Sequence, residues 1–235
     1  MSGSVSAALA SATAVCAAAW AVRGRSSAVF APSVWRAQPG RRAIALTFDD
    51  GPSRGTPELL RTLAEYGVPA TFFLIGSNAE RLPDIARATA EAGHEIGNHS
   101  YTHPNFALTR PSFIGAEFQR AQEAIEQITE RSPRYVRAPY GVRWFGFRAM
   151  QKRLGLTGAM WSIIGQDWKL PADAIARRVL SRVTDGDIIC LHDGRGTLKD
   201  SDIGTTIEAV RRIVPTLLDR GYHFETVSQL LCPTK

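Results

Sequence analysis

From residue 43 to the C-terminal end, short apolar runs alternate with amphipathic segments. Apolar runs predict strands, and segments with a period near 3.6 residues predict helices. The predicted strands cover residues 43–48, 70–75, 94–97, 135–137, 157–163, 187–191 and 222–226. The predicted helices lie between them, at residues 56–67, 83–92, 112–131, 145–154, 171–184 and 203–220. Repeated strand–helix units imply parallel strands with right-handed crossovers. Their number favours a barrel or distorted barrel of the α/β class over a small open sheet.

Residues 1–22 depart from this pattern because they are rich in alanine and carry no charged side chain. The apolar run from Val5 to Val22 approaches the ~20 residues that span a bilayer. We therefore expect residues 1–25 to form a membrane anchor or a docking helix that takes no part in the chemistry. An Ala-rich helix packed on the domain, or a frayed tail, is the alternative.

The charges around this run do not match those of a secretory signal, because no positive residue precedes it and Arg23 and Arg25 follow it. By the positive-inside rule, these flanks favour a cytoplasmic position for the rest of the chain. Residues 26–42 are rich in Ser, Pro, Gly and Arg, and they predict either a linker or a collar strand around Ser33, Val34 and Trp35.

Composition fits one globular domain with a sizeable core plus this appendage, since the 235 residues are 44% hydrophobic and 21% charged. The formal net charge of +6 favours anionic surroundings. The basic residues are nevertheless scattered and do not alternate with aromatic ones in a stripe, so nucleic acid is not expected as a partner. The three cysteines form no CxxC pair or disulfide framework, and Cys190 lies in an apolar run that predicts a core position.

Two adjacent carboxylates, Asp49 and Asp50, follow the first predicted strand and precede Gly51 and Pro52. Glycine and proline begin turns, so both carboxylates are expected where the strand enters a loop. That is where α/β sheets place their chemistry. One carboxylate could bind a metal while the other takes a proton. The same residue types are ordinary turn formers, and a solvated turn is the competing interpretation.

His99 and His103 are four residues apart, which places their imidazoles on one face if the segment is helical. That spacing suits two ligands of one divalent metal, with Asp50 as a third ligand and open positions for water and substrate. A surface pair without a metal is the alternative. His94 and His223 fit structural positions in strands.

Further polar and aromatic residues follow later predicted strands, namely Arg137, Asp167, Trp168, Leu191 and His192. Each alone has a simple explanation as a surface charge, a core aromatic or a capped turn. Together they put an acid, a base, a cation and an aromatic ring at the ends of successive strands. This arrangement predicts one catalytic site at the ends of these strands.

With these motifs, the chain resembles the polysaccharide deacetylases, carbohydrate esterase family four with the NodB-homology domain. The motifs occur in the family's order: residues 47–52, His99-Ser100-x-x-His103, Arg137-x-Pro139-Tyr140, Asp167-Trp168 and Leu191-His192-Asp193. The resemblance covers residues 43–231, so it implies a distorted (β/α) barrel as the catalytic domain. Residues 1–25 are then an N-terminal segment, 26–42 a linker and 232–235 a tail. Two residues differ from those of many family members at the same positions. Ala138 occupies a position where many members have proline, and Ile164 occupies a position where many have an aspartate near the substrate.

The resemblance also implies ligands and a base. Asp50, His99 and His103 would bind a divalent metal, zinc in most members. Asp49 would deprotonate the attacking water, and Arg137 would hold Asp49 in place and keep it ionised.

The remaining roles concern the substrate. His192, paired with Asp167, would protonate the departing amine. The backbone N–H of Tyr140 would help to stabilise the oxyanion. Trp168 and Leu191 would line the pocket for the acetyl methyl group.

The implied function is hydrolysis of N-acetyl groups on polysaccharides that contain N-acetylglucosamine, either chitooligosaccharide or peptidoglycan, with release of acetate. The resemblance favours a monomer in a membrane-associated or extracytoplasmic location, against the charge flanks of the N-terminal run. Alternatives are an amidase or esterase of the same fold acting on another acetylated sugar or a small non-sugar amide, and a catalytically inactive sugar-binding barrel. The complete set of ligands, base and acid argues against an inactive barrel.

Overall fold

The computed structural model describes residues 2–232, with side chains from residue 13 onward. Within that range the strands are β1 (Ser33–Val34), β2 (Ala43–Asp49), β3 (Thr71–Leu74), β4 (Glu95–Asn98), β5 (Tyr135–Val136), β6 (Thr157–Ala159), β7 (Ile163–Ile164), β8 (Ile188–His192) and β9 (His223–Glu225). The helices are α1 (Ser2–Arg23), α2 (Thr56–Glu65), α3 (Gly76–Arg81), α4 (Pro83–Glu91), α5 (Pro111–Thr129), α6 (Phe147–Leu154), α7 (Ala172–Leu180), α8 (Gly204–Asp219) and α9 (Val227–Leu231), with a 3-10 turn η1 (Pro139–Gly141).

All strands belong to one curled sheet in the order β1-β6-β5-β4-β3-β2-β8-β7, with β9 pairing the start of β2. Every ladder is parallel. Strand β2 is central, and all seven of its residues are buried, as expected of a parallel strand covered on both faces. The predicted α/β distorted barrel is therefore confirmed.

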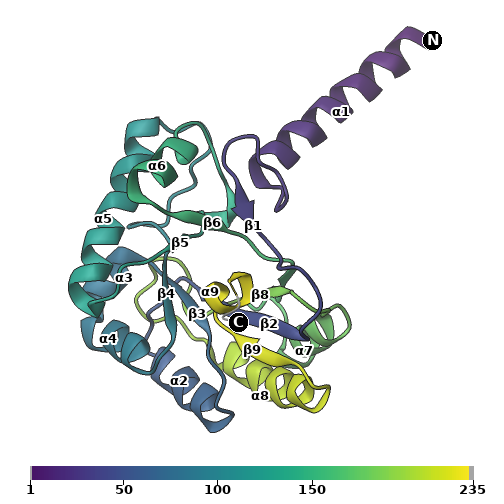
Figure 1. Cartoon of the computed structure of the whole chain (residues 1–235). Coiled ribbons are helices and arrows are strands. Elements are labelled where there is room, and N and C mark those ends of the chain that lie inside the picture. The colour runs from purple at the N-terminus through teal and green to yellow at the C-terminus, as the bar shows by residue number, and fades with distance from the viewer. Residues whose placement is uncertain (1, 233–235) are drawn as a thin grey trace.

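Amphipathic helices cover the outside of the sheet, and Figure 1 shows α2 to α8 arranged around the strands. Their apolar faces and the outer face of the sheet form the main core. Phe48 of β2 and Phe72 of β3 stack there with ring centroids 5.0 Å apart. Burying each ring contributes roughly 1.5–3 kcal/mol to folding. This packing makes the sheet a rigid base for side chains at its carboxyl ends.

The predicted strand 157–163 is two strands in the structure. Met160 N–H donates to the Val34 carbonyl at 2.7 Å, and Ser162 N–H donates to the Ile188 carbonyl at 2.9 Å. The chain thus crosses from β1, at one end of the sheet, to β8 near the other, which interrupts the ladder. The short helices α3 and α9 were not predicted, because their few residues carry little periodicity.

The N-terminal segment is helix α1, which projects from the body of the molecule (Figure 1). No helix among the described residues is long and apolar enough to cross a membrane, so the expected membrane anchor has no support here. Of the two interpretations of residues 26–42, the structure shows the strand, because β1 pairs with β6.

The chain after α1 is bound to the domain by Arg143, whose side chain is fully buried. Its guanidinium donates to the carbonyls of Gly24 and Ser27, the latter at 2.8 Å. Its backbone N–H donates to the Val22 carbonyl at 3.1 Å. A buried guanidinium needs these acceptors, so the segment that follows α1 is part of the folded unit.

Candidate active site

The carboxyl ends of the strands surround a cavity of about 420 Å³. Its first wall comes from the end of β2, where Asp49 pairs in register with His192 of β8. Asp50 follows in a left-handed conformation (φ 74°), which aspartate tolerates better than most residues. The backbone turn, rather than strand alternation, lets both carboxylates line the same cavity. The lining residues are Arg23, Asp49, Asp50, His99, His103, Ala138, Tyr140, Trp161, Ile164, Trp168, His192, Arg195 and Gly196.

Three side chains form a potential metal site. His99 Nδ1–H donates to the Arg137 carbonyl at 2.8 Å, and because a carbonyl only accepts, the Nε2 lone pair points the other way. That Nε2 lies 3.3 Å from Asp50 Oδ1, and His103 Nε2 lies 3.1 Å from the same oxygen. The donor atoms of these residues all lie within 4.8 Å of one another.

The charge state of Asp50 fits a cation. Burial raises the pKa of Asp50, but the two imidazoles more than offset that effect, so its pKa lies well below the usual value. Its Oδ2 accepts from Gly196 N–H at 2.8 Å, whereas the buried Oδ1 has no hydrogen-bond partner among the described residues. An ionised, unsatisfied oxygen facing two ring nitrogens matches a divalent ion with two His ligands and one carboxylate, leaving positions for water and substrate.

No helix brings His99 and His103 together, so the helical condition for their sharing one face is not met. The segment is an irregular loop after β4, in which Ser100 and His103 have positive φ angles of 66° and 58°. His103 N–H donates to Ser100 Oγ at 3.1 Å. Glu117 of α5 holds the loop by accepting from Thr102 N–H at 2.8 Å. The imidazoles therefore meet through a tight loop fixed from α5.

Asp49 is held from behind by Arg137. Arg137 Nη1 donates to Asp49 Oδ1 at 2.6 Å and to Thr47 Oγ1 at 2.8 Å. Its other donors bond to the carbonyls of Ala159 and Met160, and the side chain is fully buried. A charge-assisted hydrogen bond from a guanidinium that is itself fixed in this way holds the carboxylate in one orientation. Asp49 Oδ1 is thus occupied.

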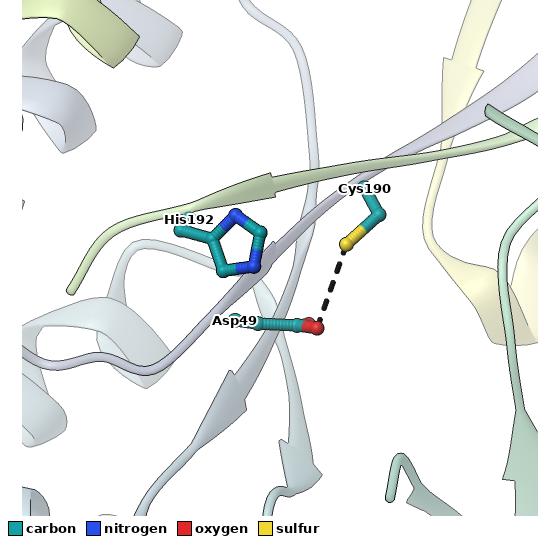
Figure 2. A group of neighbouring side chains, drawn as sticks. All are labelled: Asp49, Cys190 and His192. Atoms are coloured by element: carbon teal, nitrogen blue, oxygen red, sulfur yellow. Dashed lines mark hydrogen bonds between the residues drawn. The ribbon is translucent and has the colours of Figure 1, made fainter. Parts of the chain in front are cut away.

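A second partner of the Asp49 side chain is Cys190, which lies two residues before His192 on β8 (Figure 2). Its thiol donates to Asp49 Oδ2 at 3.5 Å. Burial, followed by the charge of Asp49, raises the pKa of Cys190 well above its ordinary value, so the thiol keeps its proton. The predicted core position is confirmed, but the sequence did not indicate the contact with Asp49.

Asp49, Cys190 and His192 also offer three donor atoms within 4.8 Å of one another. They fit a metal poorly, because Arg137 already occupies one Asp49 oxygen and the thiol resists ionisation. Thiolate is the form of cysteine that ligates metals. The Asp50 site is the better match.

His192 is paired with Asp167, as predicted. Its Nδ1 lies 2.8 Å from Asp167 Oδ1, and its backbone N–H donates to Oδ2 at 2.8 Å. Thr206 Oγ1 donates to the same Oδ2 at 2.7 Å. Burial lowers the pKa of His192, but the Asp167 hydrogen bond and the nearby carboxylates raise it to about 9. The imidazole is therefore cationic at neutral pH and its Nε2 carries a proton.

Asp193 was part of a motif but received no role from the sequence. It is fully buried and accepts from Thr56 Oγ1 at 2.7 Å. Burial, together with the charges of Asp50 and Asp49, raises its pKa to about 7. It packs so closely against Gly51 that a Cβ there would lie 2.1 Å from Asp193 Oδ2. Asp193 thus supports the loop that carries Asp50.

The residues that line the active-site cavity match the expectations from the sequence only in part. Leu191 does not line the cavity: it is fully buried in the outer core, because alternation on β8 points Cys190 and His192 inward and Leu191 outward. Tyr140 and Trp168 do lie in the wall. Arg23, at the end of α1, also lines the cavity, although residues 1–25 are expected to take no part in the chemistry.

A curled parallel sheet with an Asp-His-His site beside an oriented carboxylate and a cationic imidazole defines the class of metal-dependent hydrolases. A sequence model of the polysaccharide deacetylases matches residues 36–159. The chain belongs to this family, as its motifs predicted.

Three relatives illustrate the match. A chitooligosaccharide deacetylase of Sinorhizobium fredii is 38% identical over 205 residues, covering 84% of this chain and 95% of that protein. A peptidoglycan-N-acetylglucosamine deacetylase of Bacillus cereus is 33% identical over 200 residues, covering 82% and 69%. The crystal structure of a peptidoglycan N-acetylglucosamine deacetylase has a TM-score of 0.79 at 30% identity, covering 86% of this chain and 93% of that one.

Proposed function

We propose that this protein hydrolyses the N-acetyl group of N-acetylglucosamine units in a polysaccharide and releases acetate. The observation that carries the proposal is the convergence of Asp50, His99 and His103 between an oriented carboxylate and a protonated imidazole. The names of the relatives, which cover chitooligosaccharide and peptidoglycan, support the same reaction.

Asp50, His99 and His103 would hold the divalent ion, and zinc suits two imidazoles and a carboxylate. When bound, such an ion lowers the pKa of water and polarises a carbonyl. Asp49 accepts the proton of the attacking water through Oδ2, because Arg137 retains Oδ1. Its orientation costs nothing at the moment of reaction, since Arg137 is locked by its own hydrogen bonds.

His192 donates its Nε2 proton to the departing nitrogen, and Asp167 stabilises the imidazolium until then. Base and acid thus come from paired positions on β2 and β8. The backbone N–H of Tyr140 donates to the developing oxyanion, and Trp168 packs beside His192, with ring centroids 5.2 Å apart. With Leu191 in the core, Trp161 and Ile164 take its predicted place beside the acetyl methyl group.

The test is a substrate panel read by two products. Wild-type protein should release acetate and free amine in equal amounts from chitooligosaccharide or peptidoglycan. Asp49→Asn should lose roughly 10²–10⁴-fold in kcat while its melting temperature stays near that of the wild type. Release from a small non-sugar acetamide but from neither polymer would favour the amidase alternative, and no release from any substrate by metal-loaded protein would favour the inactive barrel.

A further inference from the structure

A second cavity, of about 310 Å³, lies directly beside the active-site cavity. The two share Trp161 and Ile164 as lining residues. The second cavity is otherwise lined by Ser162, Ile163 and Asp187 and by four arginines: Arg25, Arg36, Arg178 and Arg182. A substrate that occupies the first cavity and extends past this wall would therefore meet a strongly cationic surface.

Only one of these arginines is neutralised. Arg36 binds the buried Asp187 with its Nε at 2.9 Å and its Nη2 at 2.6 Å, both to Oδ1. Among the side chains that the structure describes, Arg25, Arg178 and Arg182 form no ion pair with a carboxylate. Burial and the neighbouring charge of Arg182 lower the pKa of Arg178. The cavity thus holds about three uncompensated positive charges.

Two of the three are fixed by the wall that both cavities share. Arg178 Nε donates to the Ile164 carbonyl at 2.7 Å, and Arg25 Nη1 donates to the Ser162 carbonyl. Each guanidinium keeps further N–H donors for a ligand. Arg25 also lies over the Trp35 ring, 5.2 Å from its centroid. Because these contacts hold like charges close together, an anion between them would relieve their repulsion.

Two further arginines line the active-site cavity together with its carboxylates. Arg23 has no ion-pair partner among the described side chains, whereas Arg195 lies 3.9 Å from Asp167 Oδ2. Guanidinium groups bind carboxylates and phosphates through paired hydrogen bonds. A neutral chitooligosaccharide offers no group that would use them.

We propose that this arginine cavity is a subsite for an anionic group of the substrate, so that the enzyme prefers an acidic N-acetylated polymer to a neutral one. Peptidoglycan has this chemistry, because its peptide stems carry carboxylates and each muramic acid that lacks a stem carries a free lactyl carboxylate. The inference rests on the proposed deacetylase function and specifies its substrate class. Because Trp161 and Ile164 line both cavities, the anion would bind on the far side of this wall from the acetyl group that is removed.

The test compares two substitutions. Arg182→Gln removes an exposed cation that has no hydrogen-bond partner among the described side chains, so the fold should survive. Arg177→Gln is the matched control, because Arg177 lies on α7, is exposed and lines neither cavity. Steady-state acetate release from peptidoglycan glycan strands and from chitopentaose gives kcat and KM for each protein.

We expect Arg182→Gln to raise KM for the acidic strands by roughly tenfold, the scale of a lost charge-assisted hydrogen bond, with kcat unchanged. KM for chitopentaose should stay within about twofold, and Arg177→Gln should match the wild type on both substrates. Added salt should raise KM for the acidic strands only, because screening weakens the attraction. Two modified strands distinguish the carboxylate sources: peptide-free strands expose the lactyl carboxylate of muramic acid, and strands with intact but amidated stems carry neither carboxylate. An effect of Arg182→Gln on the peptide-free strands alone assigns muramic acid, and an effect on neither assigns the stem carboxylates.

Equal KM values for Arg182→Gln and wild type on the acidic strands would overturn the subsite, as would an equal loss on both substrates. Wild-type protein that releases acetate from neither polymer would instead refute the deacetylase function on which the subsite rests. Arg178→Gln is a second variant for the same test and should also raise KM for the acidic strands, because it removes the cation that is bound to the Ile164 carbonyl in the shared wall.

Discussion

Replacing Asp167 with asparagine should separate the proposed acid from every other part of the site. Asp167 does not line the cavity, and its contacts with His192 and Thr206 lie behind the imidazole. The substitution keeps the shape of the side chain and can keep the hydrogen bond to Nδ1, but it removes the negative charge. We expect the basic limb of the kcat–pH profile to move to lower pH, with metal content unchanged.

The size of the effect follows from the His192 pKa. The rise from 6.5 to about 9 corresponds to ~3 kcal/mol of stabilisation of the imidazolium. Asp167 supplies most of it through its hydrogen bond and charge, working against burial. At pH 8, about nine-tenths of His192 is protonated with a pKa near 9, but only about 3% with the ordinary value. Turnover at pH 8 should therefore fall on the order of tenfold or more, whereas turnover near pH 6 should fall much less.

The assay is acetate release at saturating substrate across pH 5–10 for wild type, Asp167→Asn and Thr206→Val. Thr206→Val is the control, because it removes a hydrogen bond to Asp167 but leaves its charge. Its basic limb should stay close to that of the wild type. A bound divalent ion lowers the His192 pKa in all three proteins. The quantity to compare is therefore the difference in pH between the basic limbs of their kcat–pH profiles. Unchanged limbs in a folded, metal-containing Asp167→Asn would refute the assignment of His192 as the acid.

Two further predictions concern residues outside the known motifs. Cys190→Ala should lower kcat by roughly two- to tenfold, because Asp49 Oδ2 loses a hydrogen-bond donor. Cys190→Ser should restore kcat, because the hydroxyl can donate in place of the thiol. A wild-type kcat in the alanine variant would show that the thiol only fills space. Deleting residues 1–37 removes β1 and the acceptors of the buried Arg143, so the melting temperature should drop by roughly 10 °C for a cost of at least ~3 kcal/mol. A melting curve that does not change would show that the segment is dispensable.

Much of the catalytic site could be predicted from sequence, because strand ends in an α/β sheet meet at one edge. Asp49, Asp50 and His192 were assigned correctly to such ends, since each follows an unambiguous apolar run. Leu191 was placed wrongly because β8 is buried on both faces, so polar and apolar residues do not alternate along its sequence. The apolar run alone does not set which residues face inward, but adjacent residues of a strand point to opposite faces, so an inward His192 places Leu191 outward.

Contacts between distant segments were beyond sequence reasoning. The loop from His99 to His103 depends on positive φ angles and on Glu117 from helix α5, whereas the four-residue spacing alone suited two residues on one face of a helix. Arg23 and Arg182 are more than 150 residues apart in the chain, yet they line neighbouring cavities that share one wall.

The central claim is that Asp50, His99 and His103 hold a divalent ion on which deacetylation depends. The most direct measurement is to strip the protein with a chelator and titrate zinc back while following acetate release from N-acetylated oligosaccharide. Wild type should regain full activity at one ion per chain, and His103→Ala should bind the ion weakly and recover little at that ratio, because two ligands do not replace enough of its water shell. Full activity in the stripped wild type, or full recovery of His103→Ala at one equivalent, would contradict the account.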